Sequence, residues 1–290
     1  MQKFFNNLFQ KDFDLPESRW RGVFDYYNQG KSKLLITIGD SWTYGWRLDA
    51  DKRVQQCYGG LVAKHYGYDF LNLSLPASNN LWMLEKYQQL CANADQISYD
   101  KILIVVTLTE FGREFWTDFD HDPELHQLYK QASTARGIAQ ALANYTAHKF
   151  LSCNHPKVEL VLGINYVSNI YPKTLLPLQL PSTWLEVLLK QQLKEECITV
   201  GSWVIPKFEN LQNCNSAVDR TTLLQEMQQM IASAQKRLDL IYNSNYNYKE
   251  GYGHPNAEGH AAWANYIVSY YDSTRSLNNE CATFSYIYGN

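Results

Sequence analysis

Short apolar runs alternate along this chain with longer stretches in which apolar side chains recur at helical spacing. The apolar runs are rich in β-branched residues and predict strands buried in a sheet; they are residues 34–38, 69–75, 101–108, 158–164 and 198–205. The helical stretches are residues 57–66, 79–93, 124–150, 182–194, 221–242 and 255–271. This alternation predicts an α/β fold with one mostly parallel five-stranded sheet and helices on both faces.

The two ends of the chain do not follow the alternation. Residues 1–32 predict an N-terminal arm with short helical pieces, for example at 18–27. Residues 272–290 form a C-terminal tail that is polar and then aromatic. Between them, residues 33–271 contain no internal repeat and no convincing boundary, which predicts a single domain there.

The amino-acid composition argues against several classes of function. With 26 basic and 29 acidic residues the net charge is −3, which gives no strong attraction to nucleic acid or to a membrane surface. No apolar stretch approaches the roughly 20 residues of a membrane span, and the first residues lack the pattern of a signal peptide. We therefore expect a cytoplasmic protein or part of a soluble assembly. The six cysteines lie far apart without a C-x-x-C pair, which favours free thiols and no metal site.

The run at 34–38 ends in Gly39-Asp40-Ser41, which places a serine hydroxyl at the carboxyl end of a predicted parallel strand. Ligands bind at that edge of open α/β sheets. Asp and Ser are also favoured at helix starts, so the three residues alone fit a binding site or a simple helix cap. A nucleophilic serine needs a base within hydrogen-bond reach. Among the seven histidines His254 is the best placed, because it lies in a loop just before Pro255, which predicts a helix start.

Three segments together resemble the SGNH hydrolase superfamily, also called GDSL esterases. They are G-D-S at 39–41, N-L-S-L-P-A-S-N at 72–79, which looks like that family's second block, and H-P-N-x-x-G-H at 254–260. The resemblance covers about residues 33–271. It implies a three-layer α/β/α sandwich of flavodoxin-like type, Ser41 as nucleophile, His254 as base, and no cofactor or metal.

The chain departs from the family pattern at three supporting positions. The family's oxyanion hole uses the N–H groups of the serine and of a second-block glycine, together with an asparagine side chain. Here the first two donors correspond to Ser41 and Ala77. Thr109 stands where the asparagine is expected, and its hydroxyl can donate one hydrogen bond, so the resemblance implies it as the third donor. The family's triad aspartate corresponds to Gly251, so the resemblance implies the neighbouring Glu250 as the carboxylate that orients His254. A backbone carbonyl or a water molecule is the alternative for that role.

These residues lead to two hypotheses. The first is a serine esterase acting on a small acyl ester, such as a carbohydrate O-acetyl group or a short-chain ester, or transferring the acyl group to a sugar hydroxyl. The expected substrate-binding residues are Trp42, Tyr44, Asn79 and Arg113, although Arg113 also fits a surface ion pair with Glu110. The alternative is a catalytically impaired SGNH-type fold that serves as a binding or structural module and contacts a protein partner through its aromatic tail.

Overall fold

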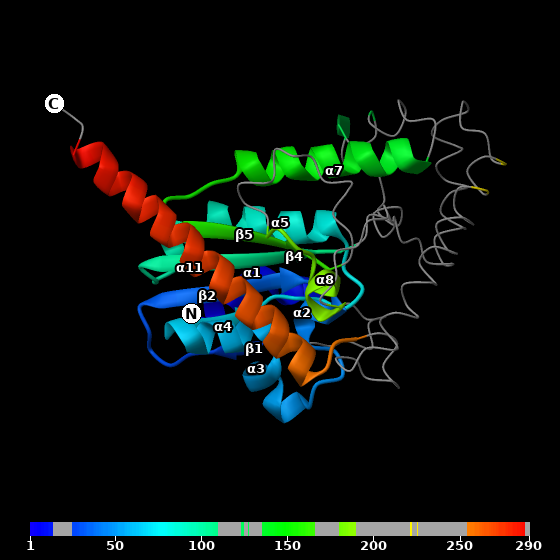
Figure 1. The fold of residues 1–290 in the computed structure, drawn as a ribbon. Helices are drawn as coiled ribbons and strands as arrows, with labels where there is room; N and C mark the ends of the chain where they lie inside the picture. The colour runs from blue at the N-terminus through cyan, green and yellow to red at the C-terminus, as the bar shows by residue number, and fades with distance from the viewer. Residues whose placement is uncertain are drawn as a thin grey trace.

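The computed structural model describes residues 1–13, 25–109, 123–124, 127, 135–165, 180–189, 221, 225 and 254–287, and the statements below concern these residues. For residues 10–13, 135–140 and 275–287 only the backbone is described. The described backbone forms one five-stranded sheet with helices on both faces (Figure 1). The predicted α/β class with a mostly parallel sheet is confirmed.

The sheet has the strand order β1-β3-β2-β4-β5. Its strands are β1 (Asp25–Tyr27), β2 (Lys33–Gly39), β3 (Asp69–Asn72), β4 (Lys101–Leu108) and β5 (Val158–Ile164). β1 pairs antiparallel with β3, and all other pairs are parallel. From β2 the chain first moves outward to β3 and then returns past β2 to β4. The order therefore reverses between β2 and β4, and the crevice beyond the carboxyl ends of such strands is where open α/β sheets bind ligands.

The helices and short 3-10 turns connect these strands. They are α1 (Gln2–Phe13), α2 (Ser41–Tyr44), η1 (Ala50–Lys52), α3 (Arg53–Gln56), α4 (Tyr58–Tyr66), α5 (Asn80–Ala92), η2 (Ala94–Gln96), α7 (Ala135–Ser152), α8 (Trp184–Leu189) and α11 (Ala257–Ile287). In Figure 1, α11 runs along the sheet and its C-terminal end extends past the strands. Within the described residues, no helix combines the length and the apolar character needed to cross a membrane.

Successive side chains along each strand point to opposite faces of the sheet and pack into two separate hydrophobic cores. Ile36 of β2 and Ile104 of β4 pack with side chains of α1, α5 and α7 on one side, which we call the α5 face. Leu35 and Leu103 pack with side chains of α4, α8 and α11 on the other, the α11 face. The fully buried tryptophans of the described chain all lie on the α11 face; they are Trp42, Trp184 and Trp263.

The strand predictions hold best in the middle of the sheet. The strands at 101–108 and 158–164 have the predicted bounds, and the strand at 34–38 is one residue longer at each end. The strand predicted at 69–75 ends at Asn72, although Leu73 N and Leu75 N still donate to the β2 carbonyls Thr37 O (2.9 Å) and Gly39 O (3.0 Å). The strand predicted at 198–205 lies outside the described residues.

The fifth strand of the described sheet is instead β1, and the helical prediction for 18–27 is wrong at residues 25–27. There Asp25–Tyr27 pairs with the edge of β3, so a tertiary contact overrides the local pattern. In the same predicted arm, Phe5 and Phe9 of α1 are fully buried on the α5 face, which shows that α1 packs against the domain.

Helix existence is predicted well and helix length less well. The helices at 57–66 and 79–93 appear as α4 and α5, and the stretch at 182–194 contains α8. The stretch at 124–150 contains α7, which runs to Ser152, whereas almost all of 221–242 lies outside the described residues. The last helix was expected to end near residue 271 but continues to Ile287. Of the cysteines, the described side chains are free thiols, as predicted; they are Cys57, Cys91 and Cys153.

Candidate active site

Ser41 lies at the point where β2 turns into α2. Asp40 caps α2, its side chain accepting a hydrogen bond from Trp42 N at 2.9 Å, and Ser41 is the first helical residue. The turn needs a glycine before it, because a Cβ atom at Gly39 would lie 2.1 Å from Thr43 Oγ1. Asp40 is thus a helix cap, and Ser41 lies at the carboxyl end of β2, where the sequence placed it.

His254 meets Ser41 across the crevice. His254 Nε2 lies 2.9 Å from Ser41 Oγ, although 213 residues separate the two in sequence. His254 immediately precedes the first turn of α11, where Asn256 Oδ1 accepts a hydrogen bond from Gly259 N (2.9 Å). For Nε2 to accept the serine hydrogen, the imidazole must carry its own proton on Nδ1. A serine paired in this way with an imidazole is the core of a nucleophilic acyl-transfer site.

Asp40 links three strand ends behind Ser41. Its carboxylate is fully buried and accepts hydrogen bonds from Asn165 Nδ2 (2.9 Å) and Thr109 Oγ1 (3.0 Å), besides the one from Trp42 N. Thr109 directly follows β4 and Asn165 directly follows β5. Three donors offset the cost of burying the carboxylate, and they fix the ends of β2, β4 and β5 relative to one another.

The predicted oxyanion role of the Thr109 side chain does not fit these contacts. Its one hydroxyl hydrogen is donated to Asp40, and the side chain is 2% exposed. The backbone of Thr109 is also engaged, since its N–H donates to Asn80 Oδ1 (2.8 Å) and its carbonyl accepts from Asn80 Nδ2 (3.0 Å). Thr109 therefore holds the strand ends together, and its hydroxyl is not available as a third donor in this structure.

Ala77 has the backbone conformation of the glycine that it replaces. Its φ is 65°, in the left-handed region that glycine favours, and its side chain is exposed. The loop around it is tied to the end of β2, because Leu75 N and Ser78 Oγ both donate to Gly39 O at 3.0 Å. Within the described part of the chain, the N–H of Ala77 forms no hydrogen bond. The N–H of Ser41, at the first position of α2, has no acceptor inside its helix either.

The predicted substrate-binding residues differ in burial and in the contacts they make. The Trp42 side chain is 1% exposed and packs edge-on against Trp184 at 5.3 Å, so it is a core residue of the α11 face and not part of a rim. Tyr44 is half-buried, with its hydroxyl accepting a hydrogen bond from Arg53 Nη1 (2.7 Å) and the Arg53 guanidinium over its ring. Asn79 caps α5 by accepting from Trp82 N at 2.8 Å. Arg113 and Glu250 lie outside the described residues.

The helix that follows His254 is anchored by contacts that the sequence did not reveal. His260 is fully buried, and its Nδ1 accepts a hydrogen bond from Tyr58 N (3.2 Å), the first residue of α4. Trp184 Nε1 donates to Gly259 O at 3.2 Å. Burial first, and then the neighbouring His254, lower the pKa of His260 to about 3. His260 is therefore a neutral acceptor that fixes the start of α11, and with it the loop that carries His254.

Among the described residues, no three histidine, cysteine or acidic side chains gather closely enough to hold a metal ion. The carboxyl ends of the strands do bring together a serine paired with an imidazole and the backbone N–H of that serine. The loop that carries the N–H of Ala77 is tied to the same place through Gly39 O. The signal that could have identified Asn165 from sequence is its position directly after the run at 158–164, at the same edge as Ser41.

No protein-family model matches this chain, and no curated protein matches it in sequence. Solved structures resemble it in fold at low identity. TesA is 14% identical, over 81% of this chain and 96% of that one, with a TM-score of 0.36. A lipolytic G-D-S-L family protein from Veillonella parvula is 11% identical over 82% and 97% (TM-score 0.34). The esterase EstA from Pseudoalteromonas sp. is 13% identical over 86% and 100% (TM-score 0.34).

Proposed function

We propose that this protein is a serine esterase of SGNH type that hydrolyses small acyl esters through Ser41 and His254. The observation that carries the proposal is the 2.9 Å contact between Ser41 Oγ and His254 Nε2 at the carboxyl edge of the sheet. It supports a nucleophile and base in contact, which is the geometry that activates a serine hydroxyl. The motif resemblance at 39–41, 72–79 and 254–260 supports the same assignment.

In the proposed reaction, Ser41 Oγ attacks the ester carbonyl while His254 Nε2 takes the hydroxyl proton. The N–H groups of Ser41 and Ala77 donate to the oxygen that becomes negative in the tetrahedral intermediate. When this intermediate collapses, the alcohol leaves with the proton from His254, and the acyl group remains on Ser41. Water then attacks the acyl-serine with His254 again as base, which releases the acid and restores the serine. Glu250 is proposed to hold the Nδ1–H of His254 in this orientation.

The oxyanion site of this proposal has two backbone donors. Loss of one donor typically lowers the rate 10²- to 10³-fold, so we expect slower turnover than a site with a third, side-chain donor would give. The proposed substrates are a carbohydrate O-acetyl group or a short-chain ester, with Tyr44, Asn79 and Arg113 as the proposed contacts to the acyl and alcohol parts. Acyl transfer to a sugar hydroxyl uses the same acyl-serine and differs only in the acceptor.

The decisive experiment is labelling of the purified full chain with a fluorophosphonate, which reacts with activated serines. We expect one label at Ser41, no label in Ser41→Ala, and ester hydrolysis lower by about 10⁴-fold or more in that variant. Ser152→Ala, an exposed serine on α7, is the matched control and should label fully. Absence of label on the folded parent protein would sink the proposal.

One observation favours the alternative of a non-catalytic module on the same fold. The Thr109 hydroxyl is engaged by Asp40, so the site lacks the side-chain donor that the family resemblance implies. Under this alternative the parent and Ser41→Ala proteins behave identically in labelling and hydrolysis. Removal of residues 282–290 would then abolish association with a protein partner while leaving the fold intact.

A further inference from the structure

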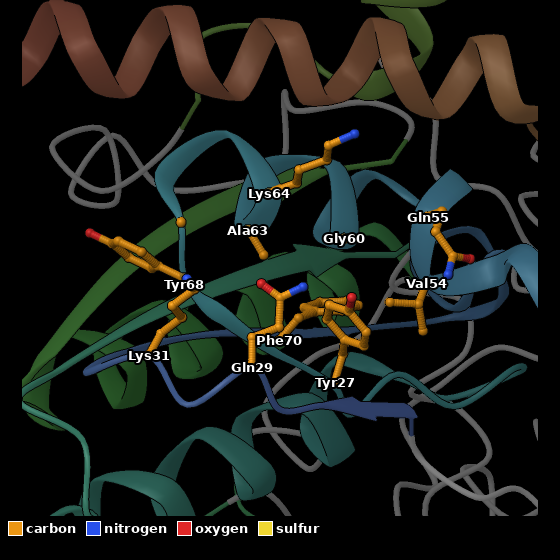
Figure 2. Close-up of a pocket in the computed structure, with 11 residues that line it drawn as sticks. Tyr27, Gln29, Lys31, Val54, Gln55, Gly60, Ala63, Lys64, Tyr68 and Phe70 are labelled. Atoms are coloured by element: carbon orange, nitrogen blue, oxygen red, sulfur yellow. The ribbon is translucent and has the colours of Figure 1, made fainter.

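A hollow lies away from Ser41, under α4 and beside β1 (Figure 2). Its volume is about 380 Å³, at the lower end of the range for small-molecule sites. Lys31, at its rim, precedes β2, whereas Ser41 follows β2. The seven residues of that strand separate the two by about 23 Å at about 3.3 Å per residue, so the hollow is a separate place on the molecule.

The hollow has an aromatic surface. Phe70 of β3 is 1% exposed and lies beneath Ala63 of α4, as Figure 2 shows, and Tyr27 of β1 stands beside Phe70. Tyr27 is 44% exposed, and among the described large hydrophobic side chains only it and Leu151 are classed as exposed. An exposed aromatic ring at the mouth of a hollow offers a flat apolar face, which suits stacking against a ring-shaped ligand.

Two amides lie within this aromatic surface. Gln29 comes from the turn after β1 and Gln55 from α3, and Figure 2 shows Gln29 near Tyr27 and Phe70. Each amide presents a carbonyl acceptor and two N–H donors. Such groups pair with neighbouring hydroxyls, which both donate and accept. The lining thus suits a ligand that has a ring and several hydroxyl groups.

The charged lining residues are both cations. Lys31 and Lys64 are exposed at the rim, and no acidic residue lines the hollow. The nearby carboxylate of Asp69 is 1% exposed and already accepts hydrogen bonds from Gln29 N (2.7 Å), from Lys31 N and from Tyr99 Oη (2.7 Å). Asp69 therefore fixes the turn that carries Gln29 and Lys31, and the rim itself favours an anionic group.

We propose that this hollow binds an acidic sugar residue, a hexuronate, as a glycan-binding site separate from the Ser41 crevice. The sugar ring stacks on the exposed ring of Tyr27, its hydroxyls pair with Gln29 and Gln55, and its carboxylate lies at the rim that carries Lys31 and Lys64. An aryl carboxylate would leave the two amides unused. A nucleotide is less suited, because the lining has no arginine and no glycine-rich loop to hold phosphates. The proposal does not depend on catalysis at Ser41.

The test is a titration of the full chain, followed by NMR or calorimetry, with methyl glucuronoside as the probe. Methyl glucoside, benzoate and acetate are the matched ligands that lack the charge, the hydroxyls or the ring. We expect the glucuronoside to bind most tightly, and its affinity to fall as salt is raised. Ser41→Ala should bind it unchanged, so loss of ester hydrolysis and loss of this binding are distinguishable.

Three variants locate the site. Lys31→Gln combined with Lys64→Gln changes two exposed side chains and should weaken glucuronoside binding about tenfold, because it removes both cations that line the hollow. Gln29→Ala should weaken the glucuronoside and the glucoside alike. Lys3→Gln, an exposed lysine on α1, is the matched control and should change nothing. Equal binding of acetate or benzoate, unchanged binding in the double lysine variant, or no saturable binding to the parent would each overturn the proposal.

Discussion

The two faces of the sheet are held by different kinds of contact. On the α5 face, the strands pack mostly aliphatic side chains against α1, α5 and α7, as in the row of register partners Ile38, Val106 and Leu162. On the α11 face, Trp42, Trp184 and Trp263 fill the space. Polar atoms join that packing: Tyr58 Oη lies 2.7 Å from Thr107 Oγ1, and His260 and Trp184 hydrogen-bond to backbone groups.

The difference between the two faces affects how precisely a helix is positioned as well as how stable the fold is. Apolar packing is non-directional and tolerates small shifts, whereas a hydrogen bond fixes distance and angle. Both faces contain such bonds, since Tyr87 Oη on the α5 face donates to Cys153 O at 2.8 Å. Those of the α11 face, however, hold α11, whose first turn follows His254. We infer that the α11 face holds the base in register with Ser41, while the α5 face mainly supplies burial.

Among the variants that test this difference between the faces, Trp184→Ala should have the largest effect on stability and labelling. Removing this fully buried ring should lower the free energy of unfolding by about 3–5 kcal/mol and, by freeing Gly259, should also reduce fluorophosphonate labelling of the remaining folded protein. Phe150→Ala on the α5 face should cost a similar free energy yet leave labelling of the folded fraction intact. Chemical denaturation and labelling below the unfolding transition measure the two effects. Equal labelling loss in both variants would remove the proposed distinction.

The next largest effect is the contribution of His260 to the pH dependence of stability. Because its folded pKa is near 3 and its ordinary value is 6.5, the folded state binds fewer protons than the unfolded state between these values. Its contribution to stability is therefore complete above about pH 6.5 and is lost as the pH falls toward 3. His260→Asn, whose Oδ1 can replace Nδ1 as acceptor for Tyr58 N, should flatten this part of the stability curve by a few kcal/mol. A parent and variant with parallel curves in denaturation series from pH 7 to pH 4 would contradict the assignment.

At the strand ends, Thr109→Val tests whether the Thr109 hydroxyl supports the buried Asp40 or acts as an oxyanion donor. It removes one of the donors to buried Asp40 at nearly constant volume and should cost about 1–3 kcal/mol of stability. Ester hydrolysis measured on the folded protein should change much less than the 10²- to 10³-fold expected for loss of an oxyanion donor. Thr109→Ser keeps the hydroxyl and should restore the stability. A 100-fold rate loss with unchanged stability would instead give the hydroxyl an oxyanion role.

The smallest effect is expected at Ala77. Ala77→Gly relieves a left-handed residue, which costs an alanine about 1–2 kcal/mol, but it also increases the freedom of the unfolded chain by about 0.4–1 kcal/mol. The net gain in stability should lie between about 0 and 1.6 kcal/mol, with labelling unchanged. Thermal unfolding of parent and variant measures it, and a clear loss of stability would mean that the left-handed conformation at this position is not strained.

Much of the sheet was predictable because its central strands are set by local sequence. The run at 101–108 is apolar except for Lys101 and Thr107 and is buried on both faces from residue 102 on, so pattern alone predicted its bounds. β1 was missed because three residues carry no periodicity, and its strand character comes from pairing with Phe70–Asn72. The continuation of α11 to Ile287 was missed because the segment after residue 271 is polar before it is aromatic.

Site residues that belong to a sequence motif could be predicted. Residues whose role depends on contacts in the folded structure could not. Ser41 and His254 were paired from sequence, and the structure brings them together. Trp42 was expected at the rim because it follows the serine, yet a helix residue one position on points about 100° away, here into the core. The roles of Asn165, Asn80 and His260 depend on partners 125, 29 and 202 residues away, which no local pattern contains.

The 213 residues between Ser41 and His254 also have a consequence during synthesis. A ribosome adds about 5–20 residues per second, so roughly 10–40 s pass after Ser41 is made before His254 exists. Under the proposed mechanism, the nascent chain carries the serine without its base throughout that interval. It is then expected not to react with acyl groups until α11 is being translated, and truncated products that end before His254 are expected to behave in the same way.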